Sequence, residues 1–365
     1  MRILDRYILK STLGLFFGCL FLFIFLYVII DLFGILKDIL EHKTPLRLVI
    51  EYYLLFLPVI FVQVSPIACL ISTLYTFGKL NRTNEIIAMR ASGLSIFQIS
   101  KTVIIFGAIV SMLIFWVNDT FVPHSLAVVS KIKKQVETGH KPQNQNQAPI
   151  NNLAMYGVGN RLFFINKFVP ANNTMEGIII LEQDEKQNIT RKILANTGEF
   201  KNNMWRFYQS ITYNFSANGQ IKGEPQFLES EIMTFPETPQ DFLTQRQRPE
   251  FMNIAELDNY LWKLSKSGAT TAIRSFKVDL YQRFAFPFTT LIITLLAIPF
   301  SLMIKKRAAV LSSVGVALLV GFLYYVFNEV GIALGKAGVL APLLSAFASH
   351  LIAFITALLL ITALP

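Results

Sequence analysis

Apolar residues along this chain gather in long uninterrupted runs separated by short polar loops. Six runs reach the roughly 20 residues that a helix needs to cross a bilayer. Runs of this length can also be core helices of a large soluble protein, but six of them favour a polytopic membrane protein. The predicted spans cover residues 12–36, 54–78, 102–122, 284–304, 309–334 and 342–364.

A largely polar segment separates the third run from the fourth. It holds a Gln/Asn/Pro-rich stretch at 141–152, which is typical of a loop, and then short β-rich runs divided by Asn, Gly and Asp. These runs predict an inserted all-β, jellyroll-like domain, an antiparallel sandwich or barrel. Helical periodicity returns near Asn253, which is expected to form a capping box with Glu256. The predicted parts are spans one to three in 1–122, the β-domain with a helical return segment in 123–280, and spans four to six in 281–365.

The net charge of +10 is explained mainly by where the basic residues lie. Short loops on one side of the spans hold ten basic residues and those on the other side hold four, so the positive-inside rule places both termini in the cytoplasm. Residues 123–283 hold 19 basic and 15 acidic residues, too even a balance to predict nucleic-acid binding. The ten are Arg2, Arg6, Lys10, Lys79, Arg82, Arg90, Lys101, Lys305, Lys306 and Arg307, and the four are Lys37, Lys43, Arg47 and Lys336.

The first run follows three basic residues, so a secretory signal peptide has to be considered. Its apolar stretch is too long and no small-residue cleavage site follows, which favours a retained span. Cys19 and Cys69 both fall inside spans, where small apolar fillers are the expected role, and they predict neither a disulfide framework nor a metal site.

The sequence contains no recognisable catalytic motif. The nearest likeness to a phosphate-binding loop, GIALGKAG at 331–338, has too few residues between its glycines and carries Ala337 where a Ser or Thr should bind magnesium. The four histidines are scattered, and no serine lies in a G-x-S-x-G elbow. We therefore predict a non-enzymatic chain without cofactor or metal, although a site assembled only in three dimensions stays open.

Charged residues near or within the spans are candidate lipid-binding groups, because a charge at membrane depth costs several kcal/mol unless it is paired or hydrated. Asp31 and Glu329 either pair with nearby lysines at the interface or face a polar cavity in the bundle. Basic residues at the outer ends of the spans suit an anionic amphiphile, or simply contact anionic lipid headgroups. They are Lys37, Lys43, Arg47, Arg274, Lys277, Arg283 and Lys336.

The loop between the second and third spans, KLNRTNEIIAMRASGLSIFQISK, predicts a short helix at about 82–94. Good N-cap residues lie at 81–84, Glu85 falls in the first turn, and Gly93 supplies a stop. Such a helix either docks a cytoplasmic partner or rests on lipid. Helical spacing places Ile86, Met89 and Arg90 on one face.

LDRYILK at the N-terminus, NEIIAMRASGLS in this loop, and the layout of three spans, a β-domain and three spans resemble the LptF/LptG (YjgP/YjgQ) permease family, slightly more the LptG type. The resemblance implies the membrane core of an ABC transporter, in which two sibling permeases, LptF and LptG, bind two copies of the ATPase LptB. It implies extraction of lipopolysaccharide from the bacterial inner membrane and its transfer, through periplasmic jellyroll domains, to LptC or LptA. ATP and magnesium would bind the ATPase, with no cofactor in this chain.

The resemblance also implies residue roles. Glu85 matches the carboxylate of a coupling helix that seats in the ATPase, within a motif of Ile86, Met89, Arg90 and Gly93. Spans one and five would line the lipid cavity, and Lys37 matches a basic position suited to lipid phosphates, although Asp31 is acidic where LptG-type relatives can carry lysine. The expected lipid-binding set is Lys37, Lys43, Arg47, Arg283, Lys336, Asp31 and Glu329, with Phe322, Tyr324 and Tyr325 as an acyl-chain wall.

Three alternatives remain open at this point. The chain could be a non-transporting envelope scaffold, a lipid-modifying enzyme that uses Asp31, Glu329 or His124 as acid or base, or a permease for another anionic lipid or a lipoprotein. In the β-domain, apolar residues would line a groove for acyl chains or form the core of the sheet. These residues are Phe163, Ile165, Ile179 and Trp205.

Overall fold

The computed structural model describes residues 3–139, 149–184, 188–216, 219–244, 249–265, 270–303 and 309–363. They form two compact units, one of Met1–Gly139 with Lys277–Pro365 and one of His140–Phe276. Some of the predicted features lie outside the described residues. These are Arg2, the basic loop at 305–307 and most of the glutamine-rich stretch.

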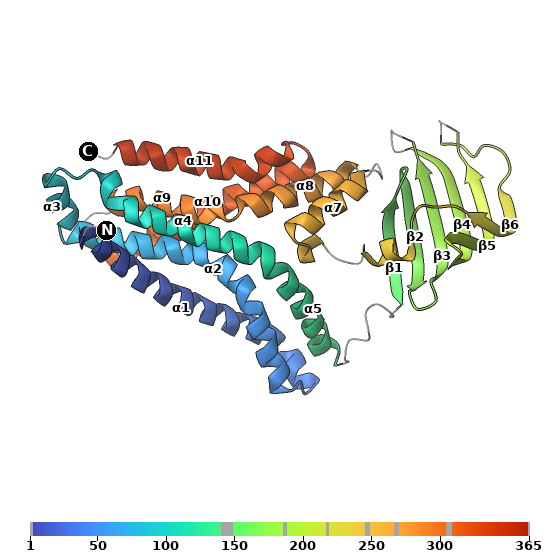
Figure 1. Ribbon diagram of the computed structural model, residues 1–365, viewed down its shortest axis with the longest axis horizontal. Helices are drawn as coiled ribbons and strands as arrows, with labels where there is room; N and C mark the ends of the chain where they lie inside the picture. The colour runs from blue at the N-terminus through green and yellow to red at the C-terminus, as the bar shows by residue number, and fades with distance from the viewer. Residues whose placement is uncertain are drawn as a thin grey trace. The chain divides into compact units, whose positions relative to one another are not determined.

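The first unit is helical (Figure 1). Among the described residues, five helices are long and apolar enough to span a membrane, and α8 with α9 makes a sixth candidate that is bent by 55°. This agrees with the six predicted spans when the bent pair counts as one. The helices are α1 (Ile3–Glu41), α2 (Leu46–Arg82), α3 (Glu85–Ala91), α4 (Ile96–Thr120), α5 (Val122–Thr138), α8 (Thr270–Ala285), of which the residues from Lys277 onward belong to this unit, α9 (Phe288–Met303), α10 (Ala309–Ala337) and α11 (Pro342–Ala363).

Helix α1 is the most weakly buried of the candidate spans. It has 39 residues, so it is about 58 Å long and exceeds the hydrocarbon core of a bilayer. Its inward side is a narrow stripe with a spacing of four residues, formed by Ile8, Thr12, Phe16 and Leu20. Residues such as Leu13 and Tyr27 are partly buried beside this stripe, whereas exposed ones such as Phe17, Phe21 and Phe33 are left for lipid or for another chain.

Helix α5 belongs to the helical unit, although the sequence placed it in the inserted domain. Val129, Ile132 and Val136 pack with Ile35 of α1 and Tyr52 of α2 in one apolar cluster. The compact β unit consequently spans His140–Phe276 and is shorter at both ends than the predicted 123–280. The mixed polar and apolar sequence of α5 concealed the face that α1 and α2 cover.

The second unit is built on one antiparallel sheet, which confirms the all-β character of the inserted segment. Its strand order is β1-β2-β3-β4-β5-β6, so each strand pairs with the next one along the chain. Phe163, Ile165, Ile178, Trp205 and Phe207 form the centre of the core on one face. The strands are β1 (Ile150–Gly157), β2 (Arg161–Val169), β3 (Thr174–Gln183), β4 (Ile189–Lys201), β5 (Met204–Asn214) and β6 (Gln226–Met233).

The alternation of buried and exposed residues reverses once along the central strands. In β2, for example, Phe163 and Ile165 are buried and the next buried residue is Phe168. Equivalent reversals occur in β3 beside Gly177 and in β5 beside Gln209, where φ is 62° and 52°. The reversal lets both halves of each long strand face the same core, a bulge-like device that strict alternation does not reveal.

A helical segment follows the sheet, and its first helix closes the core. It comprises α6 (Pro239–Thr244), the short η1 (Pro249–Phe251) and α7 (Ile254–Ser265). The ring of Phe242 packs against Phe163 and Trp205, with centroids 5.6 and 5.8 Å away. The predicted capping box is confirmed, since Glu256 N–H donates to Asn253 Oδ1 at 2.8 Å and Asn253 N–H donates to Glu256 Oε2 at 2.9 Å.

Candidate functional site

Helix α3 lies at the end of the helical unit that also carries the two chain termini (Figure 1). It is shorter than the predicted 82–94 and runs from Glu85 to Ala91. Asn84 precedes it at φ 61° without a capping side-chain bond. The helix ends as predicted at Gly93, whose φ of 89° favours glycine and whose N–H donates to the Arg90 carbonyl at 2.9 Å.

The two sides of α3 have different surroundings. Ile86 is 5% exposed and packs, with the partly buried Met89, into a cluster formed by several helices of the same unit. Ile87 is 52% exposed, and Arg90 and Ala91 are exposed on the same side at three- and four-residue spacing. The predicted shared face of Ile86, Met89 and Arg90 is therefore divided, since the first two pack inwards and only Arg90 is exposed. Ile87 lies on the exposed side, as its spacing from Arg90 could have indicated.

Glu85 is half-buried at the start of α3, and its carboxylate has a hydrogen-bond partner just before the helix. Thr83 Oγ1 donates to Glu85 Oε1 at 2.7 Å. Tyr7, in the first turns of α1, lies close enough for the Glu85 charge to act on its hydroxyl. The LDRYILK motif thus lies near the candidate coupling site, which the sequence alone did not show.

The predicted lipid-binding cations differ in whether they already form an ion pair with an acidic residue. Lys37, Lys43 and Arg47 are exposed and form no ion pair with a described residue, whereas Lys336 Nζ is 2.6 Å from Asp279 Oδ1. Lys336 is therefore already partly neutralised. The half-buried Arg283 lies in the last turn of α8.

The two acidic candidates of the spans lie in different environments. Asp31 is half-buried on α1 and accepts a hydrogen bond of 3.2 Å from the Tyr53 hydroxyl. Glu329 is exposed on α10 and does not point into the described part of the helical unit. The buried polar residue of that turn is its neighbour Asn328, at 6% exposure.

The predicted acyl-chain wall of Phe322, Tyr324 and Tyr325 is divided between two sides of α10. Phe322 is 67% exposed, Tyr325 is half-buried, and Tyr324 points into the unit with 5% exposure. The Tyr324 hydroxyl lies 3.1 Å from Thr289 Oγ1 of α9. Each residue of a helix is turned about 100° from the one before it, so Tyr324 points about 200° away from Phe322 and the three do not form one wall.

Tyr324 belongs to a buried polar cluster that the sequence analysis did not identify. Thr289 Oγ1 also lies 3.2 Å from His350 Nε2, and Ser349 Oγ donates to Asn328 Oδ1 at 2.9 Å. These contacts join α9, α10 and α11 where water is excluded, so they fix the packing of the three helices. Polar residues interrupting otherwise apolar runs were the available signal.

A shallow apolar groove of about 180 Å³ lies on the outer surface of these helices, lined by side chains such as Leu319, Leu323, Phe327 and Ile352. Helix α10 packs on α2, α9 and α11, while α1 packs on α2, α4 and α5. The two helices predicted to line a lipid cavity thus leave separate surfaces open. A closed cavity between such surfaces needs a second chain.

In the β unit, four apolar residues were predicted either to line an acyl-chain groove or to form the core of the sheet, and three of them lie in the core. Phe163, Ile165 and Trp205 are at most 2% exposed and belong to the core. Ile179 lies on the opposite face, paired across strands with Phe164 and Leu194. Ile211 and Phe227 extend this apolar row to β6.

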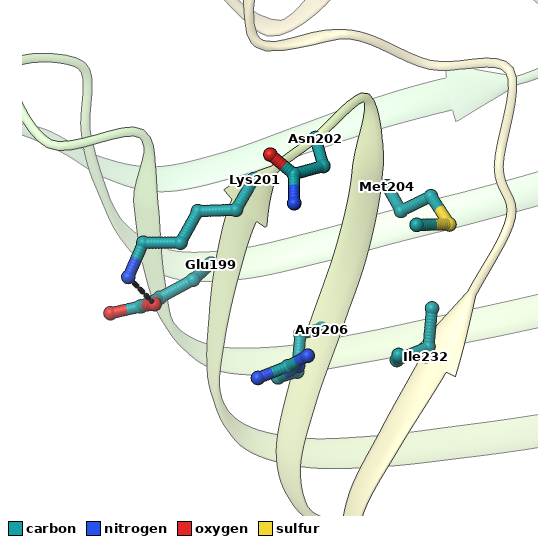
Figure 2. A pocket seen from close by; sticks show the side chains of 6 residues that line it. All are labelled: Glu199, Lys201, Asn202, Met204, Arg206 and Ile232. Atoms are coloured by element: carbon teal, nitrogen blue, oxygen red, sulfur yellow. Dashed lines mark hydrogen bonds and ion pairs between the residues drawn. The ribbon is translucent and has the colours of Figure 1, made fainter.

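A small surface pocket of about 170 Å³ lies beside the β4–β5 turn (Figure 2). Arg206, Lys201 and Glu199 share it with Met204 and Ile232. Figure 2 shows the Lys201 ammonium directed towards Glu199, and the two groups form an ion pair of 2.7 Å. The pocket has mixed charge and is too small for an acyl chain.

One carboxylate of the β unit is buried. Glu237 is 3% exposed, its Oε1 accepts the Val158 N–H, and its Oε2 has no partner among the described residues. Burial raises the pKa of the Glu237 carboxyl above its ordinary 4.5, and the Val158 N–H and the Arg161 charge oppose this shift. Glu237 thereby ties the segment after β6 to the end of β1.

Comparison with known proteins identifies the family of this chain. The family described as lipopolysaccharide export system permease LptF/LptG matches residues 6–363, nearly the whole chain. The chain belongs to the LptF/LptG permease family. The lipopolysaccharide export system permease protein LptG of Haemophilus influenzae is 22% identical over 329 residues, 90% of this chain and 89% of that protein. LptG of Escherichia coli K12 is 22% identical over 330 residues, with the same two shares. The LptF/LptG resemblance is confirmed, and both relatives agree with its LptG-like character.

Proposed function

We propose that this chain couples ATP hydrolysis by a separate ABC ATPase dimer to the extraction of lipopolysaccharide from the inner membrane. As a family member it is a multi-pass inner-membrane permease subunit of the lipopolysaccharide export system. The finer proposal assigns both termini and α3 to the cytoplasmic side and the β unit to the periplasm. It assigns no catalytic role to this chain.

The observation that carries the proposal is the construction of α3. Ile86 and Met89 fix the helix to the bundle, which leaves Ile87 and Arg90 directed outwards. An isolated seven-residue helix is not stable in water, so this one persists because the chain anchors it. A rigid helix with an exposed apolar side chain and a cation is suited to dock into a groove of a partner protein.

The lipid route follows from the surfaces that one chain leaves open. The exposed apolar sides of α1 and α10 would face a sibling permease, LptF or LptG, across a cavity for acyl chains. Lys37, Lys43 and Arg47 would meet lipid phosphates at its outer end, since none is paired with a described residue. Closure of the ATPase dimer would narrow the cavity and move the lipid towards an LptC- or LptA-like jellyroll protein.

Affinity purification in mild detergent tests the docking role, because the chain offers closely matched controls. Ile50 and Ile87 are both 52% exposed, and an exposed Glu51 follows Ile50 at the other end of the bundle. We expect Glu85→Ala and Ile87→Ala to reduce recovery of the ATPase subunit about tenfold, which corresponds to about 1.4 kcal/mol. Ile50→Ala and Glu51→Ala should leave recovery unchanged.

The same purification separates the proposal from its rivals. Lipopolysaccharide and a sibling permease should accompany the wild-type chain, as identified by mass spectrometry. Recovery without any ATPase, under conditions that preserve membrane complexes, would favour a scaffold. Conversion of lipid by the purified chain without nucleotide would favour an enzyme.

A further inference from the structure

A short segment after β6 covers the centre of the apolar core of the sheet. Phe242 of α6 is 1% exposed. Its ring centroid lies 5.6 Å from that of Phe163 and 5.8 Å from those of Phe168 and Trp205. Leu243 packs against the same core. A helix of six residues is not stable alone, so α6 keeps its place only through such contacts, and the core would lose this cover without them.

Glu237 fastens the start of this segment to two parts of the sheet. Its backbone carbonyl accepts the Trp205 Nε1–H at 2.8 Å, and its Oε1 accepts the Val158 N–H just beyond the end of β1. A Cβ atom at Gly157 would collide with Glu237 Oε1, so the glycine leaves room for the carboxyl group. Oε2 is buried and has no partner among the described residues. This position therefore suits the neutral acid better than the carboxylate, because an unpaired buried charge costs more than a neutral group.

The charges around Glu237 do not offset the cost of its burial. Arg161 of β2 lowers the pKa of the Glu237 carboxyl and Asp241 of α6 raises it. The Arg161 charge is shared, since its Nε also lies 3.1 Å from Glu182 Oε1 of β3. Burial is the largest influence, and it holds the pKa above its ordinary 4.5. Ionisation of Glu237 consequently weakens the covered arrangement as the pH rises above 4.5.

We propose that residues 237–243 form a proton-dependent lid, closed over the core when Glu237 is protonated and released when it ionises, so that an acyl chain of the transported lipid takes the place of Phe242. An acyl chain fits because the surface beneath Phe242 is formed by aromatic side chains of the core. The role of the lid in transport rests on the proposed function and extends it by a regulation of the β unit. Acidity on the side of the β unit would close the lid and slow the passage of lipid.

Trp205 reports on the lid, because its ring packs against Phe242 and its Nε1–H donates to the Glu237 carbonyl. Trp116→Phe and Trp262→Phe, at positions that are 55% and 62% exposed, leave Trp205 as the single tryptophan of the full chain. The chain is placed in lipid nanodiscs. Quenching of the Trp205 fluorescence by a bromine-labelled lysophosphatidylcholine, whose headgroup does not titrate in the range used, then measures the access of an acyl chain.

Three variants separate the parts of the lid. Glu237→Gln imitates the protonated acid, and Phe242→Ala removes the covering ring. Glu229→Gln is the matched control, because it changes an exposed carboxylate of β6 in the same unit. For the wild type we expect quenching to rise at least about threefold from pH 4.5 to about pH 8, since ionisation favours the open lid. Glu237→Gln should stay weakly quenched throughout, Glu229→Gln should follow the wild type, and Phe242→Ala should be strongly quenched at every pH.

Quenching of the wild type that does not change with pH would overturn the proposal. A pH dependence that persists in Glu237→Gln would also overturn it, by assigning the switch to another group. Weak quenching of Phe242→Ala, with the sheet intact by circular dichroism, would show that acyl chains do not reach the core and would overturn it as well.

These measurements do not involve the ATPase, so they are independent of the proposed function. In the complete complex, reconstituted with the sibling permease and the ATPase, Glu237→Gln should lower the lipopolysaccharide released per ATP at least about twofold at neutral pH. An unchanged ratio would overturn the role of the lid in transport. A wild-type complex without ATPase would instead overturn the proposed function and leave the quenching result standing.

Discussion

The adjacent residues Ile86 and Ile87 allow anchoring and docking to be separated with the same chemical change. Ile86 is 5% exposed in a cluster of α1, α2, α4 and α9 side chains, whereas Ile87 is 52% exposed. Replacing a buried isoleucine by alanine removes its transfer free energy and leaves a cavity, which together cost about 2–5 kcal/mol. The same change at a half-exposed position away from such features costs within about 0.5 kcal/mol.

Thermal unfolding of the purified chain in detergent measures the first effect, and ATPase recovery from membranes measures the second. We expect Ile86→Ala to lower the unfolding midpoint by about 4–10 °C, at about 2 °C per kcal/mol for a large chain. Ile87→Ala should leave the midpoint within about 1 °C, because its cost to folding is small, and still reduce ATPase recovery. A larger loss of midpoint for Ile87→Ala than for Ile86→Ala would refute the assignment of the two faces.

Three further predictions concern other parts of the chain. Glu237→Gln should raise the free energy of unfolding of the β unit at neutral pH. Because burial raises the pKa of the Glu237 carboxyl in the folded state, its contribution to stability is full below pH 4.5 and is lost as the pH rises through the folded pKa. Hydrogen exchange should therefore show a pH-dependent stability of the β unit in the wild type that the variant lacks. Lys37→Ala should weaken lipopolysaccharide retention in detergent more than Lys336→Ala, because only Lys336 is neutralised by Asp279; an equal effect would contradict this. Asn328→Ala should lower the unfolding midpoint by removing the acceptor 2.9 Å from Ser349 Oγ on α11, which then keeps only the longer contact of 3.3 Å with His350 Nδ1. The cost is about 1–3 kcal/mol, and an unchanged midpoint would show that the bond contributes nothing.

The spans were predictable because the length of an apolar run is set by the thickness of the bilayer, whatever surrounds the helix. The site of α3 was predictable for a local reason as well, since Gly93 supplies the left-handed residue that ends the helix. Its working face was not predictable. Ile86 and Ile87 are chemically identical neighbours, and only the packing of α1, α2, α4 and α9 decides which of them is covered.

The other features that the sequence did not predict also depend on contacts between distant parts of the chain or on backbone conformation. Tyr324 is indistinguishable from Tyr325 in sequence, and its inward position depends on Thr289 from a distant helix. The reversal of alternation beside Gly177 arises from backbone conformation within paired strands, so a period-two pattern conceals it. Tyr7 lies far from Glu85 along the chain, and the Glu85 charge acts on it only because the folded chain brings the first turns of α1 near the start of α3.

The central claim is that the outward face of α3 docks an ATPase, and site-specific photocrosslinking in native membranes tests it most directly. A photoreactive residue placed at position 87 should form an adduct with an ATP-hydrolysing subunit. The same residue at position 50, where the native isoleucine has the same 52% exposure, should form none. An adduct at neither position, or adducts with lipid alone at position 87, would contradict the claim.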